Sequence, residues 1–256
     1  MKKHKLIWFY IFTLVFTVIL GGIGGTLLDE SNYSHYAIML TMTQSSPTLG
    51  LFLICVFSKN FIAFKGIKWY IAPKKLIWLL SATIIPAILI VGSAVILSVT
   101  GTAYVTGAYN SFTALLIVII ASVLGATGEE IGWRGFMLPV LHKKHNLLIS
   151  SIITGVLWGV WHFGKIQLFG ITGYLLFTLL CVEFTILMAW ILIKANRSII
   201  PMIVFHSLIN IFSVLFLNER EGIAFYIAAC IIGCVLCGII ILTNKTLFFT
   251  QTIDKN

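Results

Sequence analysis

Acidic side chains are scarce in this sequence: only 8 of its 256 residues are Asp or Glu, against 17 Lys or Arg. Charged residues together make up 10% of the chain and hydrophobic residues 59%. This composition is far too apolar for a soluble domain, and it leaves no room for a sizeable soluble domain beside the apolar segments. The chain is therefore predicted to be a membrane protein.

Several signatures of common enzymes are also missing. Neither the GxSxG turn of serine hydrolases nor the HExxH helix of thermolysin-type metalloproteases occurs, so those mechanisms have no local support. The 5 cysteines all lie in apolar runs, and no second CxxC pair accompanies Cys234 and Cys237 to complete a zinc site. Because Cys230, Cys234 and Cys237 follow helical spacing, we expect a packing stripe.

Long apolar runs are abundant. A membrane span needs about 20 apolar residues, so we predict an all-α, polytopic membrane protein of about eight transmembrane helices that forms a single domain, residues 1–256. The second run is the weakest, because Pro47 and the polar residues before it predict a kink or a re-entrant segment. The predicted spans are 6–26, 37–57, 76–99, 114–138, 147–165, 171–193, 199–217 and 223–243.

Basic residues alternate between the predicted loops. With the N-terminus inside, the outer segments hold only Lys165 and Arg220 among the basic residues, and all other loop Lys and Arg lie inside. The positive-inside rule then predicts a multi-pass protein of the plasma membrane with both termini in the cytoplasm. The formal net charge of +9 is thus a topology signal, aided by anionic lipid of the bilayer, and no nucleic-acid partner is expected. The apolar run after the basic N-terminus is expected to be an uncleaved first span.

The most informative stretch runs from Gly128 to Gly135, directly after the apolar run 114–126. Two adjacent carboxylates and a guanidinium at membrane depth each cost about 3 kcal/mol or more unless they are partnered. On a helix, Glu130 and Arg134 share a face and can neutralise each other. Glu129 points about 100° away from Glu130, which leaves one intramembrane carboxylate for another purpose.

Four further polar side chains lie within later predicted spans: His162, Glu183, His206 and Asn210. A lone membrane histidine usually packs or donates a hydrogen bond, but several such groups in consecutive spans favour a shared site. If the fourth helix continues to Pro139, whose ring would end it, Glu129 lies about 12–15 Å inside its cytoplasmic end. Glu129, His162, His206 and Asn210 can then converge around a cytoplasm-side intramembrane cavity.

Three motifs follow in order on separate predicted spans: Glu129-Glu130-x-x-x-Arg134, Trp158-x-x-x-His162 and His206-x-x-x-Asn210. Together they resemble the CPBP (Abi) family, which comprises the CAAX prenyl-protease type II enzymes and bacterial bacteriocin-processing or immunity proteins. The resemblance covers about residues 114–215 and implies that this region is the catalytic core of an intramembrane endopeptidase. Trp158 departs from the family pattern, whose second motif usually begins with Phe, although an aromatic side chain is kept.

By motif position, the resemblance implies that Glu129 is a general base and that His162 holds the same water. His206 and Asn210 would donate hydrogen bonds to the tetrahedral oxyanion. The residue types suit these roles, because a carboxylate in a low-dielectric cavity becomes more basic. Two donors one helical turn apart can aim at one oxygen, and each such donor contributes about 3–4 kcal/mol in acyl transfer.

The remaining site residues have less specific expected roles. Glu130 and Arg134 would form a structural pair that orients the helix. Trp158 and Glu183 are candidates for substrate binding, although Glu183 matches no family motif and could instead pair with Lys or Arg near a helix end. We expect no cofactor, but Glu129, His162 and His206 would also make a three-ligand zinc set with water in the fourth position.

Two other functions stay open. The chain could be a non-catalytic membrane receptor or bacteriocin-immunity protein on the same scaffold. It could also be a transporter whose buried carboxylates relay protons, although no inverted repeat is evident. For the protease, we expect a peptide or membrane-protein substrate rather than a CAAX protein, and the sequence does not indicate an oligomeric state.

Overall fold

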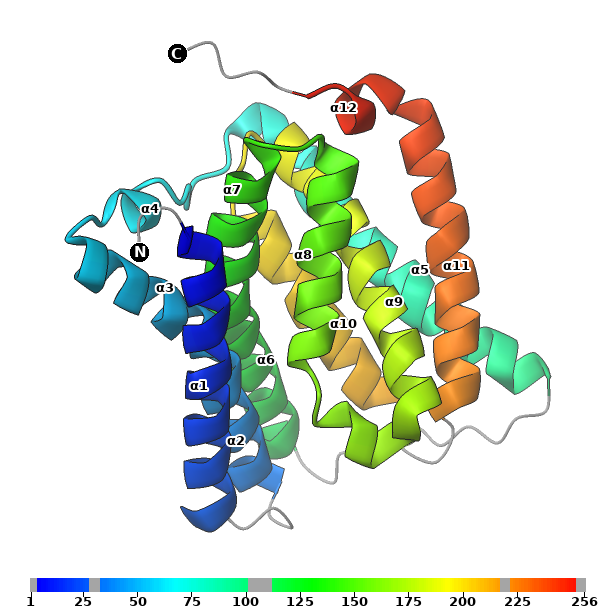
Figure 1. Cartoon of the computed structure of the whole chain (residues 1–256). Coiled ribbons are helices and arrows are strands. Elements are labelled where there is room, and N and C mark those ends of the chain that lie inside the picture. The colour runs from blue at the N-terminus through cyan, green and yellow to red at the C-terminus, as the bar shows by residue number, and fades with distance from the viewer. Residues whose placement is uncertain (1–3, 28–32, 101–111, 217–221, 252–256) are drawn as a thin grey trace.

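The structure is a computed structural model that describes residues 4–27, 33–100, 112–216 and 222–251. In these ranges the regular structure is helical, with no strand and one isolated bridge between Lys68 and Ser198. Figure 1 shows the long helices packed as a bundle, with the short α4, α7 and α12 near one end. The all-α fold is confirmed.

Each of the predicted spans coincides with apolar helix. Among the described residues, 6 helical stretches are long and apolar enough to cross a membrane, and the fifth and seventh predicted spans form shorter apolar helices. The polytopic membrane architecture is therefore confirmed. The main helices are α1 (Lys5–Leu27), α2 (Tyr33–Gln44), α3 (Ser46–Ser58), α5 (Ile77–Val99), α6 (Phe112–Gly132), α8 (Leu147–Trp161), α9 (Lys165–Lys194), α10 (Ile200–Phe216) and α11 (Gly222–Thr243). The short elements are α4 (Ile62–Lys65), η2 (Pro73–Lys75), η3 (Trp133–Met137), α7 (Leu138–His142) and α12 (Lys245–Phe249).

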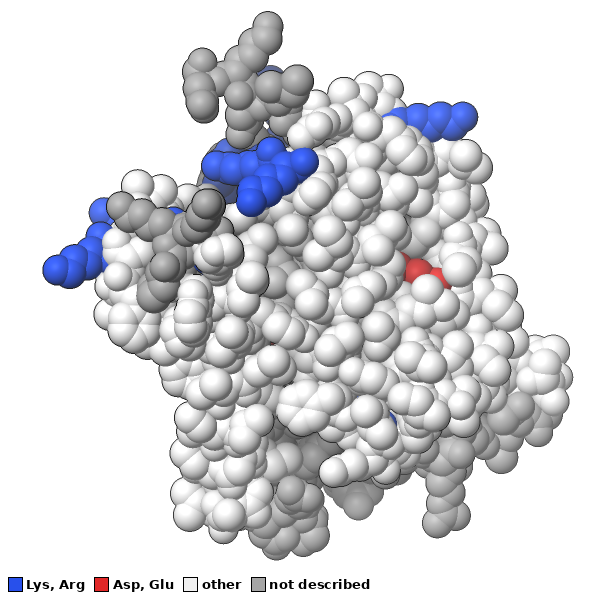
Figure 2. All heavy atoms as spheres, viewed as in Figure 1, with Lys and Arg blue, Asp and Glu red and all other residues white. Residues whose placement is uncertain are grey.

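Charge is segregated along the bundle. Figure 2 shows Lys and Arg side chains mainly at the end that carries α4, α7 and α12, above a wide band of neutral side chains. Many large apolar side chains in this band are exposed, among them Ile84 and Ile231, as expected for helices that face lipid. Of the two basic residues predicted in outer segments, Arg220 lies outside the described residues.

The second predicted span is broken at the expected place. Helix α2 ends at Gln44 and α3 begins at Ser46, with Pro47 in its first turn, where the missing amide hydrogen costs nothing. The break packs against α6, and Thr48 Oγ1 donates to the carbonyl oxygen of Gly128 at 2.6 Å. Polar side chains in this stretch therefore form hydrogen bonds between the α2–α3 break and α6.

Three glycines on one face of α6 make room for this break: Gly125, Gly128 and Gly132. A Cβ atom on Gly128 would lie 2.9 Å from the carbonyl oxygen of Gln44 and 2.9 Å from the Cα atom of Ser45. Both neighbours are backbone atoms and cannot turn aside. The close approach of the helices thus depends on residues without side chains.

The helix that carries Glu129 continues further than predicted. Helix α6, the π-helical turn η3 and α7 run on to His142, so the prediction that Pro139 ends the helix is wrong. A proline ring clashes with the preceding turn of an α-helix, and the wider π-helical turn directly before Pro139 relieves that clash. Glu129 therefore lies about 20 Å along the helix from its end at His142, deeper than expected.

We predict that Gly128→Ala destabilises the protein by about 1–3 kcal/mol, because the added methyl group forces α6 away from the α2–α3 break. Thermal unfolding in detergent measures the effect. Gly238→Ala is the matched control, since a Cβ atom there meets open space. An unchanged midpoint for Gly128→Ala would show that the helices separate at no cost.

Candidate active site

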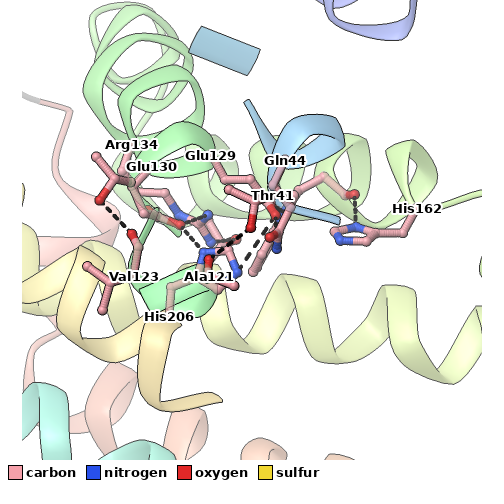
Figure 3. Close-up of polar contacts among 12 residues, drawn as sticks. Thr41, Gln44, Ala121, Val123, Glu129, Glu130, Arg134, His162 and His206 are labelled. Atoms are coloured by element: carbon pink, nitrogen blue, oxygen red, sulfur yellow. Dashed lines mark hydrogen bonds and ion pairs between the residues drawn. The ribbon is translucent and has the colours of Figure 1, made fainter. Parts of the chain in front are cut away.

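A buried polar network lies where α6, α8, α9 and α10 meet the α2–α3 break. Glu129 and Glu130 have no exposed surface, and Arg134 is 1% exposed. Figure 3 shows the side chains of Glu129, Glu130, Arg134 and His206 pointing toward one another. The conformation is therefore closed over both carboxylates, and the predicted cytoplasm-side cavity stays a prediction.

The ion pair between Glu130 and Arg134 forms as predicted. Arg134 Nη1 donates to Glu130 Oε1 at 2.9 Å, and its Nη2 donates to the hydroxyl of Thr185 on α9, also at 2.9 Å. The guanidinium also lies over the Trp158 ring, 4.1 Å from its centroid. Arg134 thus connects α6, α8 and α9, and Thr185 is a member of the network that the sequence motifs do not include.

His206 lies between the two glutamates. Its Nδ1 is 2.8 Å from Glu130 Oε1, and its Nε2 is 3.9 Å from Glu129 Oε1. An ionised carboxylate only accepts hydrogen bonds, so Nδ1 carries the hydrogen of the shorter contact. Glu130 therefore does more than pair with Arg134: it also fixes the orientation of the His206 ring.

Glu129 accepts hydrogen bonds on both oxygens from neutral donors. The amide Nε2 of Gln44 donates to Oε1 at 2.9 Å, and the indole Nε1 of Trp158 donates to Oε2 at 2.6 Å. Acceptance on both oxygens is the pattern of an ionised carboxylate. Neither donor was predicted from the sequence, although the polar break in the second span was a signal for Gln44.

His162 lies apart from the carboxylates. Its Nδ1 is 2.9 Å from the carbonyl oxygen of Trp158, and its ring packs edge-on against Trp158, Trp161 and Phe177. Figure 3 shows the His162 ring separated from the group around Glu129. Since a carbonyl oxygen only accepts, Nδ1 carries the hydrogen, and in the neutral ring Nε2 is left as an acceptor.

Asn210 and Trp158, the two other predicted site residues, differ in their contacts with the network. Asn210 follows His206 by one turn of α10 and is half-buried. Trp158 is 3% exposed and touches Arg134, Glu129 and His206, so its role in substrate binding stays a prediction.

Glu183 faces α11 and not the network. The Cys234 thiol donates to Glu183 Oε1 at 3.0 Å, and the Cys237 thiol donates to the Glu183 carbonyl oxygen at 3.5 Å. Cys230 makes a similar bond to the carbonyl oxygen of Leu176. The cysteine stripe therefore packs α11 against α9, as predicted. For Glu183, where the sequence left substrate binding and pairing with Lys or Arg as alternatives, the structure shows a thiol contact, and substrate binding stays a prediction.

The three residues considered for zinc do not form a ligand set in this structure. Zinc needs nitrogen and oxygen donors about 2 Å from one point. His206 Nδ1 is engaged with Glu130, its Nε2 is 3.9 Å from Glu129, and His162 packs against the tryptophans. In the described part of the chain, no group of three or more His, Cys, Asp or Glu side chains is placed to hold a metal ion.

The fold and the site together define a polytopic all-α membrane protein with a buried network of two glutamates, an arginine and a histidine. Residues 111–212, which contain the three motifs, match the sequence family described as "Type II CAAX prenyl endopeptidase Rce1-like". This match confirms the resemblance to the CPBP family that the motifs predicted, and it supports an intramembrane endopeptidase activity.

The chain is also similar to two known proteins. The chain is 27% identical to CAAX prenyl protease 2 of Methanococcus maripaludis over 267 aligned residues, which cover 95% of each chain. It is 28% identical to lysostaphin resistance protein A of Staphylococcus haemolyticus over 126 residues. That second match covers 48% of this chain and 34% of the staphylococcal protein.

We predict that Arg134→Met lowers the free energy of unfolding by about 3–5 kcal/mol, because Glu130 is left as a buried charge without its cation. Combining it with Glu130→Gln should restore part of the loss, since both charges are then gone. Chemical unfolding in detergent measures both variants. Arg197→Met is the control, because Arg197 is exposed. Equal losses for Arg134→Met and Arg197→Met would contradict a structural role for the pair.

Proposed function

We propose that the protein is an intramembrane endopeptidase that cleaves a membrane-associated peptide or protein, with Glu129 as the general base. The observation that carries this proposal is the state of Glu129: it is fully buried at membrane depth and accepts hydrogen bonds on both oxygens, yet it has no ion-pair partner as close as that of Glu130. A buried carboxylate that is oriented but not neutralised is a strong base.

In the proposed reaction, Glu129 takes a proton from a water molecule while the water oxygen attacks the carbonyl carbon of the scissile bond. His162, which lies apart from Glu129 in this closed conformation, would reach the same water once the site opens to substrate, and its Nε2 would then accept the second water hydrogen while Nδ1 binds the Trp158 carbonyl. The tetrahedral intermediate then loses the amine as the carbon–nitrogen bond breaks. Glu129 returns the proton to the leaving nitrogen, which balances the reaction.

His206 and Asn210 would stabilise the negative oxygen of this intermediate. Because His206 Nδ1 donates to Glu130, its Nε2 can donate to an oxyanion only when the ring carries both hydrogens.

The natural substrate is proposed to be a peptide or membrane protein that reaches the site from the basic end of the bundle. The basic end is proposed to face the cytoplasm of the plasma membrane, with both termini on that side, because positive residues concentrate there. The name of the methanococcal relative adds prenylated proteins as a second substrate class. Prenylated and unprenylated versions of one peptide distinguish the two classes.

The decisive experiment compares wild type with Glu129→Gln in the native membrane. We expect the variant to fold with an unchanged thermal midpoint, because the amide keeps the shape of the side chain, and to lose at least 100-fold in cleavage rate. Mass spectrometry of new peptide termini identifies the products that vanish. If a folded Glu129→Gln protein leaves all termini unchanged, the catalytic proposal fails.

That second outcome would favour a non-catalytic resistance or immunity protein on the same scaffold. The partial match to a protein named for lysostaphin resistance is the observation that keeps this alternative. Survival of producing cells under bacteriocin challenge, compared for wild type and Glu129→Gln, separates the two functions.

We further propose that the reaction needs no metal, because the histidines and Glu129 do not share one coordination point. The zinc chelator 1,10-phenanthroline should therefore leave the cleavage rate unchanged within about twofold. The control is 1,7-phenanthroline, which has the same shape but does not chelate. Loss of activity with the first compound alone, and its recovery on addition of Zn²⁺, would overturn the metal-free mechanism.

A further inference from the structure

The two oxygens of Glu129 accept hydrogen bonds from residues that lie on different helices, one before and one after Glu129 in the sequence. Gln44 comes from the end of α2 and is separated from Glu129 by 85 residues, while Trp158 comes from α8. Gln44 also lies outside residues 111–212, the region that matches the family. One contact of the proposed base therefore comes from a part of the chain that the family motifs do not cover.

The position of Gln44 is a consequence of the broken span. Because α2 stops at Gln44, its side chain projects at the break, and the glycine face of α6 lets it approach. A Cβ atom on Gly125 would collide with the Gln44 side-chain amide. The polar break and the glycines of α6 thus act together to bring the Gln44 amide within hydrogen-bonding distance of Glu129.

Trp158 is held just as firmly. The Arg134 guanidinium lies on its face, His206 packs edge-on against it at 5.2 Å between ring centroids, and its indole donates to Glu129. A phenylalanine in this position, as the family pattern has it, could keep the ring contacts but would leave Glu129 Oε2 without this donor. The departure from the pattern therefore adds a hydrogen bond.

We propose that Gln44 and Trp158 are positioning residues that fix the plane of the Glu129 carboxylate, so that the α2–α3 break is part of the active site. This inference rests on the proposed role of Glu129 as the base. Two donors on separate oxygens prevent rotation of the carboxylate, and both are neutral. They orient the base without cancelling its charge, which a lysine or arginine in either position would do.

The test removes each donor while keeping the shape of the side chain, in Gln44→Met and Trp158→Phe. A hydrogen bond to a charged group contributes about 1.5–3 kcal/mol, so each variant should lower kcat about 10- to 100-fold with KM changed less than about twofold. The double variant should lose less than the product of the two single effects, because both donors act on one carboxylate. Rates are measured from the termini that depend on Glu129.

Thr48→Val and Trp190→Phe are the matched controls. Thr48 bonds the same break to α6 through the Gly128 carbonyl, and Trp190 on α9 packs edge-on against Trp78, so neither touches Glu129. Both controls should keep kcat within about twofold. If Thr48→Val lowers kcat as much as Gln44→Met does, or if Gln44→Met and Trp158→Phe keep full kcat, the positioning proposal is overturned.

A spectroscopic readout tests the same proposal without a substrate. The infrared carboxylate bands that disappear in Glu129→Gln belong to Glu129, and we expect them to shift in Gln44→Met and in Trp158→Phe but not in Thr48→Val. Unshifted bands would overturn the positioning proposal. If the proposed function itself is wrong, the result is a different one: Glu129→Gln retains full cleavage activity, whether or not the bands shift in the donor variants.

Discussion

Two adjacent carboxylates deep in a membrane protein must each find donors inside the protein, and the centre of this structure is arranged around that requirement. Glu130 is satisfied by a guanidinium and an imidazole, and Glu129 by an amide and an indole. Consecutive residues of one helix point in different directions, so no single neighbour can serve both. Helices α6, α8, α9 and α10 and the α2–α3 break must therefore meet at one level.

Close packing of helices makes that meeting possible. The Gln44 side chain is short, so its amide reaches Glu129 only if the α2–α3 break lies directly against α6. The glycine face of α6 permits this approach. The π-helical turn that follows carries Arg134 and absorbs the misfit of Pro139. The helix can thus continue to His142, which sets the depth of the two glutamates within the bundle.

The sequence predicted the features that depend on local spacing. The apolar runs, the pairing of Glu130 with Arg134 and the packing stripe of α11 each follow from composition or helical period, and the structure has them. Gln44 could not be predicted as a contact of Glu129, because nothing local relates residues 85 positions apart. The direction of His162 depends on the rings around it, and the thiol contacts of Glu183 depend on how α11 packs. Pro139 was misjudged because a π-helical turn leaves little trace in sequence.

The structure distinguishes two neighbouring glutamates that the motif presents as equals. Glu130 Oε1 receives a hydrogen bond from Arg134 and another from the His206 ring, so its charge is compensated by a close cation. Glu129 receives only neutral donors at short range, and the nearest histidine nitrogen is 3.9 Å away. Of the pair, Glu129 is therefore the one that has no cation at hydrogen-bonding distance, while Glu130 is suited to hold His206 in position. Adjacent identical side chains thus acquire different chemistry from the charge of the groups that hold them.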